Sequence, residues 1–301
     1  MQKKLMIFGG SGFVGGNMAH VAQKSGWEVI IADTRPGPSG EWRSVDITDQ
    51  SSLESAIDSV RPDAVVNVAA IADIDLAEQK KDLAYRVNVD GARFVAECCA
   101  RKKIPYVFFS SDAVFDGERD GYFEDDIPSP VNYYGRTKRE AEQAVMRAYP
   151  SVAVIRISLV LGFPLGSGNS FFAGLYAKLK EGKTVLAPTF EVRTPVDVIT
   201  LSECVLELCD NGFAGIMHVG ATDSVSRFDL TRTLARRMGF DEQRVQPQNQ
   251  PDNNPARAPR HKNGIIRVDK ARTILKTPLL STEGGIERAF REKPAAFLLS
   301  H

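Results

Sequence analysis

Apolar and polar residues alternate along the N-terminal segment in an order that predicts a strand, a turn, a helix and a second strand. The first apolar run ends at Gly9, and the second ends at Asp33. Between them, Gly9, Gly12 and Gly15 lead into a segment with the apolar period of an amphipathic helix. Glycine suits a sharp turn and a close approach of the backbone to pyrophosphate, and a helix N-terminus offers unpaired N–H groups to the anion. The pattern therefore predicts half of a nucleotide-binding α/β sheet.

The same alternation of strands and helices continues along the rest of the chain. Strands are predicted over 63–70, 104–111, 152–162 and 215–220, and helices over 51–60, 82–103, 132–149 and 267–290. Two segments rich in turn-forming or polar residues, 163–169 and 246–263, are predicted as mobile loops and as candidates for a substrate lid. Together these elements predict a doubly wound parallel α/β sheet of the Rossmann type.

Composition narrows the possible partners. The 301 residues include 38 lysines and arginines and 38 aspartates and glutamates, which gives no general attraction to nucleic acid or to an anionic membrane. No apolar run approaches the ~20 residues that a membrane helix needs. The four cysteines, Cys98, Cys99, Cys204 and Cys209, lack the spacing of a zinc site and are expected as buried thiols. We expect a cytoplasmic protein that binds a small molecule and no metal.

The end of the second predicted strand carries the residues expected to select the cofactor. Asp33 follows Gly15 by eighteen positions, close to the ~20 expected for a ribose contact. Its carboxylate would accept hydrogen bonds from the ribose hydroxyls and repel a 2′-phosphate, which favours NAD. Arg35 would instead pair with that phosphate, so the choice between NAD and NADP stays open, with a slight preference for NAD. Asp46 and Ile47, after the next short extended run, are expected to contact the adenine.

Three further residues are suited to proton transfer beside a nicotinamide. Tyr134 and Lys138 lie four positions apart on a predicted helix and therefore share one of its faces, whereas Tyr133 does not share a face with Lys138. A cation ~5 Å from the phenol, at an effective dielectric of ~20, contributes about 3 kcal/mol, so Lys138 is expected to lower the pKa of Tyr134 by roughly two units. Tyr134 is the predicted proton donor to a ketone oxygen that Ser111 holds.

These motifs resemble those of the extended short-chain dehydrogenase/reductases. The resemblance lies in GGSGFVG, in NVAA at 67–70, in SSDAVFDG at 110–117 and in YGRTK at 134–138, and it extends over essentially the whole chain. The chain looks most like the dTDP-4-dehydrorhamnose reductase branch, which implies a reductase of a 4-keto nucleotide sugar. The resemblance implies the same catalytic roles for Ser111, Tyr134 and Lys138, and a contact from Lys138 to the cofactor.

The resemblance also implies positions for the cofactor and the substrate. Residues expected to line the cofactor or support its wall are Gly9, Gly12, Phe13, Val14, Asp33, Asp46, Ile47, Ala69, Ala70 and Asn88. Residues expected to contact the sugar or the diphosphate are Asp112, Asn169, Arg193 and Arg260. A dinucleotide-binding domain of 1–162 plus about 194–220 is expected, with a small discontinuous substrate-binding lobe of about 163–193 plus 221–301. A homodimer through the helices near 83–101 and 132–149 is also implied.

Two departures from the branch leave the substrate open. Ala113 stands where the branch usually has Tyr, and Leu159 stands where it usually has Trp, so two aromatic sugar contacts are missing. Asp112 is followed by Ala113 rather than Glu, which argues against a dehydratase. The alternatives are a nucleotide-sugar epimerase that recycles its cofactor, and a non-catalytic subunit like the regulatory subunit of methionine adenosyltransferase, which resembles the same branch.

Overall fold

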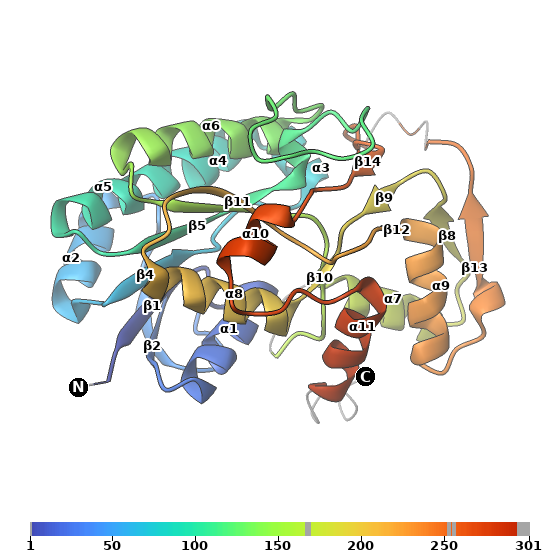
Figure 1. Ribbon diagram of the computed structural model, residues 1–301, viewed down its shortest axis with the longest axis horizontal. Coiled ribbons are helices and arrows are strands. Elements are labelled where there is room, and N and C mark those ends of the chain that lie inside the picture. The colour runs from blue at the N-terminus through green and yellow to red at the C-terminus, as the bar shows by residue number, and fades with distance from the viewer. Residues whose placement is uncertain (1, 166–169, 252–253, 255–256, 294–301) are drawn as a thin grey trace.

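A seven-stranded parallel sheet forms the centre of the molecule (Figure 1). The computed structural model describes residues 2–165, 170–251, 254 and 257–293. The strand order is β11-β6-β5-β4-β1-β2-β3, with the first strand in the interior and the chain winding outward in both directions. The strands are β1 (Lys4–Phe8), β2 (Glu28–Asp33), β3 (Glu41–Ser44), β4 (Ala64–Asn67), β5 (Tyr106–Ser111), β6 (Ala153–Ile157) and β11 (Gly215–Val219).

Helices cover both faces of this sheet. Alternate residues of each strand point to opposite faces, so β1 sends Leu5 and Ile7 to one side and Met6 and Phe8 to the other. The first side is covered by α1 (Phe13–Lys24), α8 (Val198–Asn211) and α10 (Asp269–Ile274). The second side is covered by α2 (Gln50–Val60), α5 (Ala92–Lys102) and α6 (Tyr133–Ala148). This arrangement confirms the predicted doubly wound Rossmann fold.

Two predicted elements are interrupted in the structure. The helix expected over 82–103 consists of α4 (Lys81–Tyr85), a π-helical turn η1 (Arg86–Gly91) and α5. In η1 the Asn88 amide bonds both backbone groups of Ile71 and the Thr137 hydroxyl, at 2.8 to 3.2 Å. The strand expected over 152–162 divides into β6 and β7 (Val160–Leu161), and β7 leaves the main sheet to pair with β10 (Val196–Asp197).

A smaller lobe lies at the carboxyl end of the sheet, on the right in Figure 1. It contains α7 (Phe171–Lys180), α9 (Arg227–Arg237) and α11 (Thr282–Arg291), with short strands between them. In these short sheets β8 (Val185–Pro188) pairs with β13 (Val245–Gln248), and β9 (Val192–Arg193) pairs with β12 (Val225–Ser226) and β14 (Asn263–Gly264). The loop predicted from 246 onward is therefore wrong at its start, because Gln246 to Gln248 form strand β13. The C-terminal helical segment is divided between α10 and α11.

Three short elements complete the described part of the fold. They are α3 (Ile74–Gln79) and the 3-10 turns η2 (Asp112–Val114) and η3 (Glu242–Arg244).

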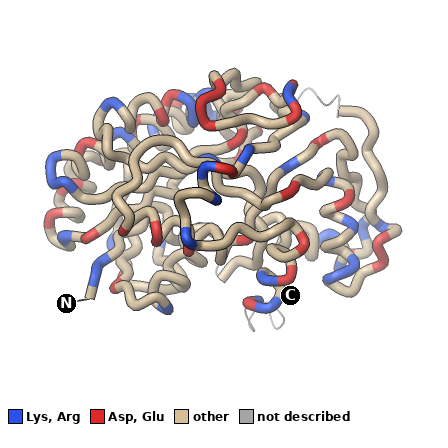
Figure 2. The backbone as a smooth tube through the Cα atoms, in the orientation of Figure 1, with Lys and Arg blue, Asp and Glu red and all other residues tan. Residues whose placement is uncertain are grey.

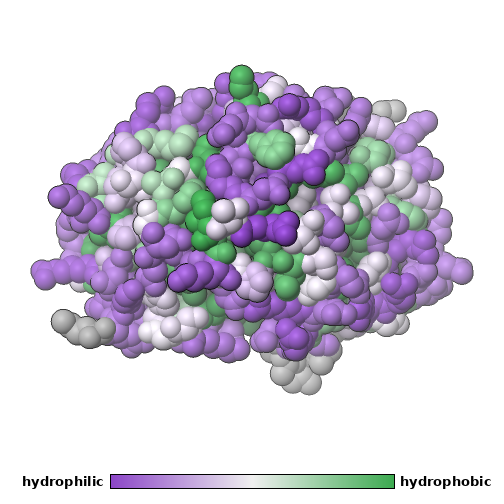
Figure 3. All heavy atoms as spheres, in the orientation of Figure 1, coloured by the Kyte–Doolittle hydropathy of each residue, from purple (hydrophilic) through white to green (hydrophobic). Residues whose placement is uncertain are grey.

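Charged side chains of both signs are interspersed over the surface. Figure 2 shows basic and acidic residues close together along most of the chain, as expected from equal numbers of each. Hydrophilic residues cover most of the face seen in Figure 3, with apolar residues between them. None of the helices that the structure describes is long and apolar enough to cross a membrane.

Candidate active site

The glycine turn brings the start of α1 against the ends of two strands. Gly9 has a positive φ of 83°, and a Cβ there would lie 2.6 Å from the Ala69 backbone nitrogen. A Cβ on Gly15 would lie 2.4 Å from the Gly9 carbonyl oxygen, so both positions exclude any side chain. Gly12 is the N-cap of α1 and offers no side chain to cap the helix. The first N–H groups of α1 are therefore suited to an anion.

A cavity of about 330 Å³ lies beside this turn. Its wall includes Gly9, Gly12, Asp33, Arg35, Asp46, Ile47, Ala69 and Ala70, which are eight of the predicted cofactor residues. Asp33 is held by Ser11, whose N–H and hydroxyl both donate to Oδ2, at 3.1 and 2.8 Å. Asp46 also accepts from the backbone and hydroxyl of Thr48, at 2.9 and 2.8 Å. The cavity combines apolar walls with a fixed acid at the end of β2, as an adenosine site requires.

A second cavity of about 360 Å³ contains the predicted catalytic residues. Ser111 ends β5, whereas Tyr134 and Lys138 lie one turn apart on α6, and all three line this cavity together with Val14. Its wall shares Val68 and Ala70 with the adenosine cavity, so the two form one continuous groove. Phe13 is not among the residues that line either cavity, and Asn88 supports the wall through Ile71. Tyr133 contacts Lys81 instead, whose ammonium lies 5.4 Å from the ring centre.

The predicted lowering of the Tyr134 pKa is not found. Burial raises the pKa of Tyr134 to about 12, although a hydrogen bond with Ser111 acts in the opposite direction. Burial lowers the pKa of Lys138 to about 8, and its ammonium lies 4.5 Å from the ring centre of Phe108. The prediction counted the attraction of a cation and left out the cost of burying a phenolate, which is the larger effect here. Tyr134 consequently keeps its proton at neutral pH, as a proton donor must.

A buried ion pair holds α6 against the sheet one turn after Lys138. Glu142 bonds Arg156 of β6 twice, with two distances of 2.8 Å, and both side chains are almost fully buried. Ser110, the residue before Ser111, donates to the same carboxylate. This pair fixes the helix that carries Tyr134 and Lys138 relative to the strand that carries Ser111. Sequence analysis missed it, although Glu142 and Arg156 at apolar positions of a helix and a strand were a detectable signal.

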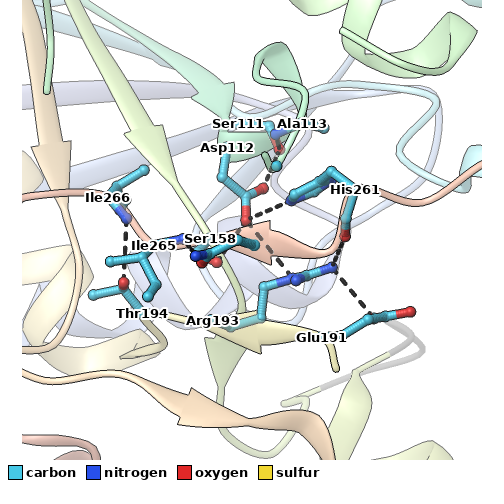
Figure 4. A network of polar contacts seen from close by, with 12 residues as sticks. Ser111, Asp112, Ala113, Ser158, Glu191, Arg193, Thr194, His261, Ile265 and Ile266 are labelled. Carbon is cyan, nitrogen blue, oxygen red and sulfur yellow. Dashed lines mark hydrogen bonds and ion pairs between the residues drawn. The ribbon is translucent and has the colours of Figure 1, made fainter. Parts of the chain in front are cut away.

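Asp112 is the centre of a polar network beside Ser111 (Figure 4). Its Oδ2 accepts from the Ser158 hydroxyl at 2.6 Å and lies 3.3 Å from His261 Nε2 and 3.9 Å from Arg193 Nε. Burial would raise the pKa of Asp112, but His261, Arg193 and Ser158 hold it at about 2. Asp112 is therefore a buried carboxylate that stays charged.

A third cavity, of about 790 Å³, continues from the catalytic one into the lobe. It shares Ile74 and Arg193 with the catalytic cavity. Its lining includes one acid, Glu191, and six basic residues, which are Lys178, Arg193, Arg227, Arg257, Arg260 and Lys262. Such an excess of cations favours a ligand with more than one negative charge.

Two predicted substrate residues line this third cavity but already bond groups of the protein. Arg193 donates to the carbonyls of Val192, His261 and Lys262, at 2.8 to 3.1 Å. Arg260 bonds both carboxylate oxygens of Asp75, at 2.6 and 2.8 Å. Asn169 lies outside the described residues.

Arg227 is a cation of this cavity that sequence analysis missed. Its guanidinium lies 4.1 Å from the ring centre of Phe171. Burial, together with the nearby Arg193, lowers the Arg227 pKa to about 10. Burial is the larger cause of this shift, and Glu191 and Asp112 act against it.

The described residues contain no cluster of three or more potential metal ligands. A Rossmann sheet whose strand ends carry this glycine turn, with Ser111, Tyr134 and Lys138 around one cavity, defines an oxidoreductase of the extended short-chain dehydrogenase/reductase class.

Comparison with known proteins specifies the family. The family model described as RmlD substrate binding domain matches residues 3–293, so the chain belongs to this family. The chain is 33% identical over 251 residues to a dTDP-4-dehydrorhamnose reductase of Mycobacterium tuberculosis, covering 81% of this chain and 79% of the relative. These matches confirm the resemblance expected from the motifs.

A solved structure and a second relative complete the comparison. The dTDP-4-dehydrorhamnose reductase of Bacillus anthracis, in complex with NADP, is similar with a TM-score of 0.87 and 27% identity, covering 97% of this chain and all of that one. Methionine adenosyltransferase 2 subunit beta of Pongo abelii is 25% identical over 251 residues, covering 81% of this chain and 75% of the relative.

Proposed function

We propose that this protein is an NAD(P)-dependent reductase of a 4-keto nucleotide sugar. The observation that carries the proposal is the row of three cavities that share walls. The first suits adenosine, the second contains Ser111, Tyr134 and Lys138, and the third is lined by six basic residues. A dinucleotide in the first would place its nicotinamide in the second, and a diphosphate in the third would place an attached sugar beside it.

Tyr134 is the proposed proton donor in this reaction. A nicotinamide bound in this groove would supply hydride to the carbonyl carbon. The phenol of Tyr134 would give its proton to the carbonyl oxygen, which Ser111 would hold by a hydrogen bond. A pKa of about 12 keeps the donor protonated at neutral pH. Lys138, with a pKa of about 8, is mainly cationic there and would stabilise the phenolate that forms.

The third cavity supports a nucleotide diphosphate as the remote part of the substrate. Guanidinium groups pair bidentately with phosphate oxygens, and Arg227 is one of the six basic residues that line this cavity. We assign the substrate-binding lobe to about 163–193 plus 221–301, with Arg193 and Arg260 at its boundary with the dinucleotide-binding domain. Asp112, Arg193 and Arg260 bond protein groups in this structure, so their contacts to the sugar or diphosphate remain part of the proposal.

The cofactor is proposed to be NAD or NADP, with a slight preference for NAD. Asp33 lines the adenosine cavity with a fixed carboxylate, which supports NAD. Arg35 lines the same cavity and would support NADP, and the Bacillus anthracis relative holds NADP. A protein that accepts both cofactors fits these opposing charges.

A homodimer in the cytoplasm completes the proposal. The outer side of α4, α5 and α6 carries an open hollow of about 660 Å³, lined by Tyr85, Arg93 and Arg139 among others, which a second copy would cover. The four cysteines are buried and free, which supports a reducing compartment. Analytical ultracentrifugation of wild type and Arg139→Glu tests the dimer, which the variant should weaken.

The test of the reductase is turnover with a panel of 4-keto sugar nucleotides. A reductase consumes one NAD(P)H per product, an epimerase interconverts sugars without net consumption, and a regulatory subunit does neither. The similarity to methionine adenosyltransferase 2 subunit beta is the reason for including a regulatory subunit among the alternatives.

Tyr134→Phe should lower kcat by about 10²- to 10⁴-fold, the usual contribution of general acid catalysis, and should leave cofactor affinity unchanged. Tyr133→Phe is the matched control and should keep wild-type turnover. Unchanged turnover in Tyr134→Phe would refute the proton-donor role.

A further inference from the structure

His261 reaches the catalytic cavity from the C-terminal segment of the chain. It lies just before β14, with 4% of its surface exposed, and it lines the same cavity as Ser111 and Tyr134. Figure 4 shows its ring directed at the Asp112 carboxylate, with Nε2 3.3 Å from Oδ2. A Cβ on Gly264 would lie 2.4 Å from that oxygen and 2.8 Å from Nε2, so the glycine permits this approach.

Hydrogen bonds hold the backbone around His261, whereas none to a described residue is formed by the nitrogens of its ring. Arg193 donates to the carbonyls of His261 and Lys262, and the Asn263 N–H donates to the Gly117 carbonyl. Both ring nitrogens are buried, yet neither has a described partner in full hydrogen-bond geometry. A buried histidine with a purely structural role normally has its nitrogens bonded. Both nitrogens of this ring are therefore available for a hydrogen bond, and Nε2 is the one that faces Asp112.

Asp112 in turn competes for the proton of Ser111. The Ser111 hydroxyl has one proton, and in this structure it donates to Asp112 Oδ1 at 3.1 Å, while Oγ accepts from the Ala113 N–H. To hold a substrate carbonyl, Ser111 must turn that proton away from the carboxylate. A charged carboxylate is a stronger acceptor than a neutral ketone, so Asp112 opposes this turn unless other donors satisfy it.

We propose that His261 is a positioning residue that acts through Asp112 to release the hydroxyl proton of Ser111 for the substrate carbonyl. In this proposal Nε2, which lies 3.3 Å from Oδ2, donates a hydrogen bond to that oxygen and draws the carboxylate charge away from Oδ1. Ser158 and Arg193 approach Oδ2 as well and act in the same direction. The segment at 258–264 therefore couples the position of the substrate lobe to the activation of the carbonyl. This inference rests on the proposed reductase function.

Two substitutions of His261 distinguish a role in hydrogen bonding from a role in packing. His261→Gln keeps a donor, and His261→Leu removes it while filling similar space. We expect His261→Leu to lower kcat about tenfold or more, the usual effect of losing a hydrogen bond to a charged group, with the KM of the sugar nucleotide changed less than about threefold. His261→Gln should recover most of the lost kcat. Equal losses in the two variants, or a loss confined to KM, would overturn the proposal.

A double-mutant cycle tests whether His261 acts through Asp112. In an Asp112→Asn background, His261→Leu should have no further effect on kcat, because the carboxylate is gone. Additive losses would show that His261 acts independently. The control His20→Gln, on α1 outside this network, should keep wild-type kcat in both backgrounds.

A measurement without substrate keeps this inference distinct from the proposed function. The ¹⁵N NMR spectrum of the His261 imidazole should place a proton on Nε2, and Asp112→Asn should shift that nitrogen. An unprotonated Nε2, or one that Asp112→Asn leaves unmoved, would contradict the inference whatever the substrate. Absence of ketone reduction by the wild type would instead contradict the proposed function alone.

Discussion

At the scale of single residues, we propose that two opposite charges at the end of β2 decide between the cofactors. Asp33 is fixed by Ser11, whereas Arg35 follows it within the same cavity wall. Asp33→Ser should raise the ratio of kcat/KM for NADPH to that for NADH by roughly tenfold, about 1.4 kcal/mol, because the repulsion of a 2′-phosphate disappears.

Arg35→Ala should shift the same ratio in the opposite direction. Steady-state kinetics with both reduced cofactors measures the two changes. If both substitutions leave the ratio unaltered, neither residue contacts the 2′ position and the assignment of this cavity to adenosine is weakened.

Lys138 illustrates how a buried charge destabilises the fold that holds it. Burial lowers the pKa of its amine from 10.5 to about 8, and at about 1.4 kcal/mol for each pKa unit the charged form costs the folded state about 3 kcal/mol. This cost is present below pH 8 and disappears as the pH rises above 10.5, because the amine is then neutral in both states. Lys138→Met should therefore be inactive yet more stable than wild type at pH 7, with the difference vanishing near pH 10.5.

Urea denaturation at several pH values measures this effect, and a less stable Lys138→Met at pH 7 would contradict it. The activity of the wild type should depend on the same ionisation of Lys138. In the proposed mechanism the ammonium stabilises the phenolate, so kcat/KM should fall as the pH rises through about 8.

At the scale of elements, the position of α6 depends on the buried pair of Glu142 and Arg156. Glu142→Gln should lower the free energy of unfolding by about 3–5 kcal/mol, because it leaves the buried guanidinium of Arg156 without its counter-charge. The double variant Glu142→Met/Arg156→Leu should be more stable than the single one, since no unpaired charge remains. A single variant as stable as wild type in urea would show that the pair does not hold the helix.

The elements predicted from sequence were those with strong local patterns. Local patterns were sufficient to predict these elements. Apolar runs predicted β1, β2 and β5, and the apolar period of a helix predicted α2 and α6. Helices α7 and α9 were missed, and β13 was taken as a loop, because their structure depends on packing with distant segments such as β8 and α11. The π-helical turn in the long predicted helix depends on bonds from Asn88 to Ile71 and Thr137, far along the chain.

At the scale of the whole molecule, one C-terminal segment joins the lobe to the Rossmann sheet. Arg260 clamps Asp75 at the start of α3, the Pro259 carbonyl accepts from the Asn132 amide at 3.0 Å, and His261 contacts Asp112. Arg260 and the Ala258 N–H hold the pKa of Asp75 at about 2, so this link persists at any ordinary pH. The lobe is therefore fixed beside the predicted catalytic residues.

The part of the candidate site that consists of motifs with fixed spacing could be predicted from the sequence. The glycine turn and the pair of Tyr134 and Lys138 are local, and the structure brings them to one groove. His261 and Arg227 were not predictable, because they come from distant segments with no motif. Their roles depend on the packing of the lobe, which no local pattern specifies.

The central claim is that hydride passes from a nicotinamide to the ketone of a nucleotide sugar within this groove. Turnover with [4-²H]NAD(P)H, followed by mass spectrometry of the product, tests it most directly. The account predicts that deuterium appears on the former carbonyl carbon, with one cofactor oxidised for each sugar reduced. A protein that binds the cofactor but transfers no deuterium to any 4-keto sugar nucleotide would contradict it.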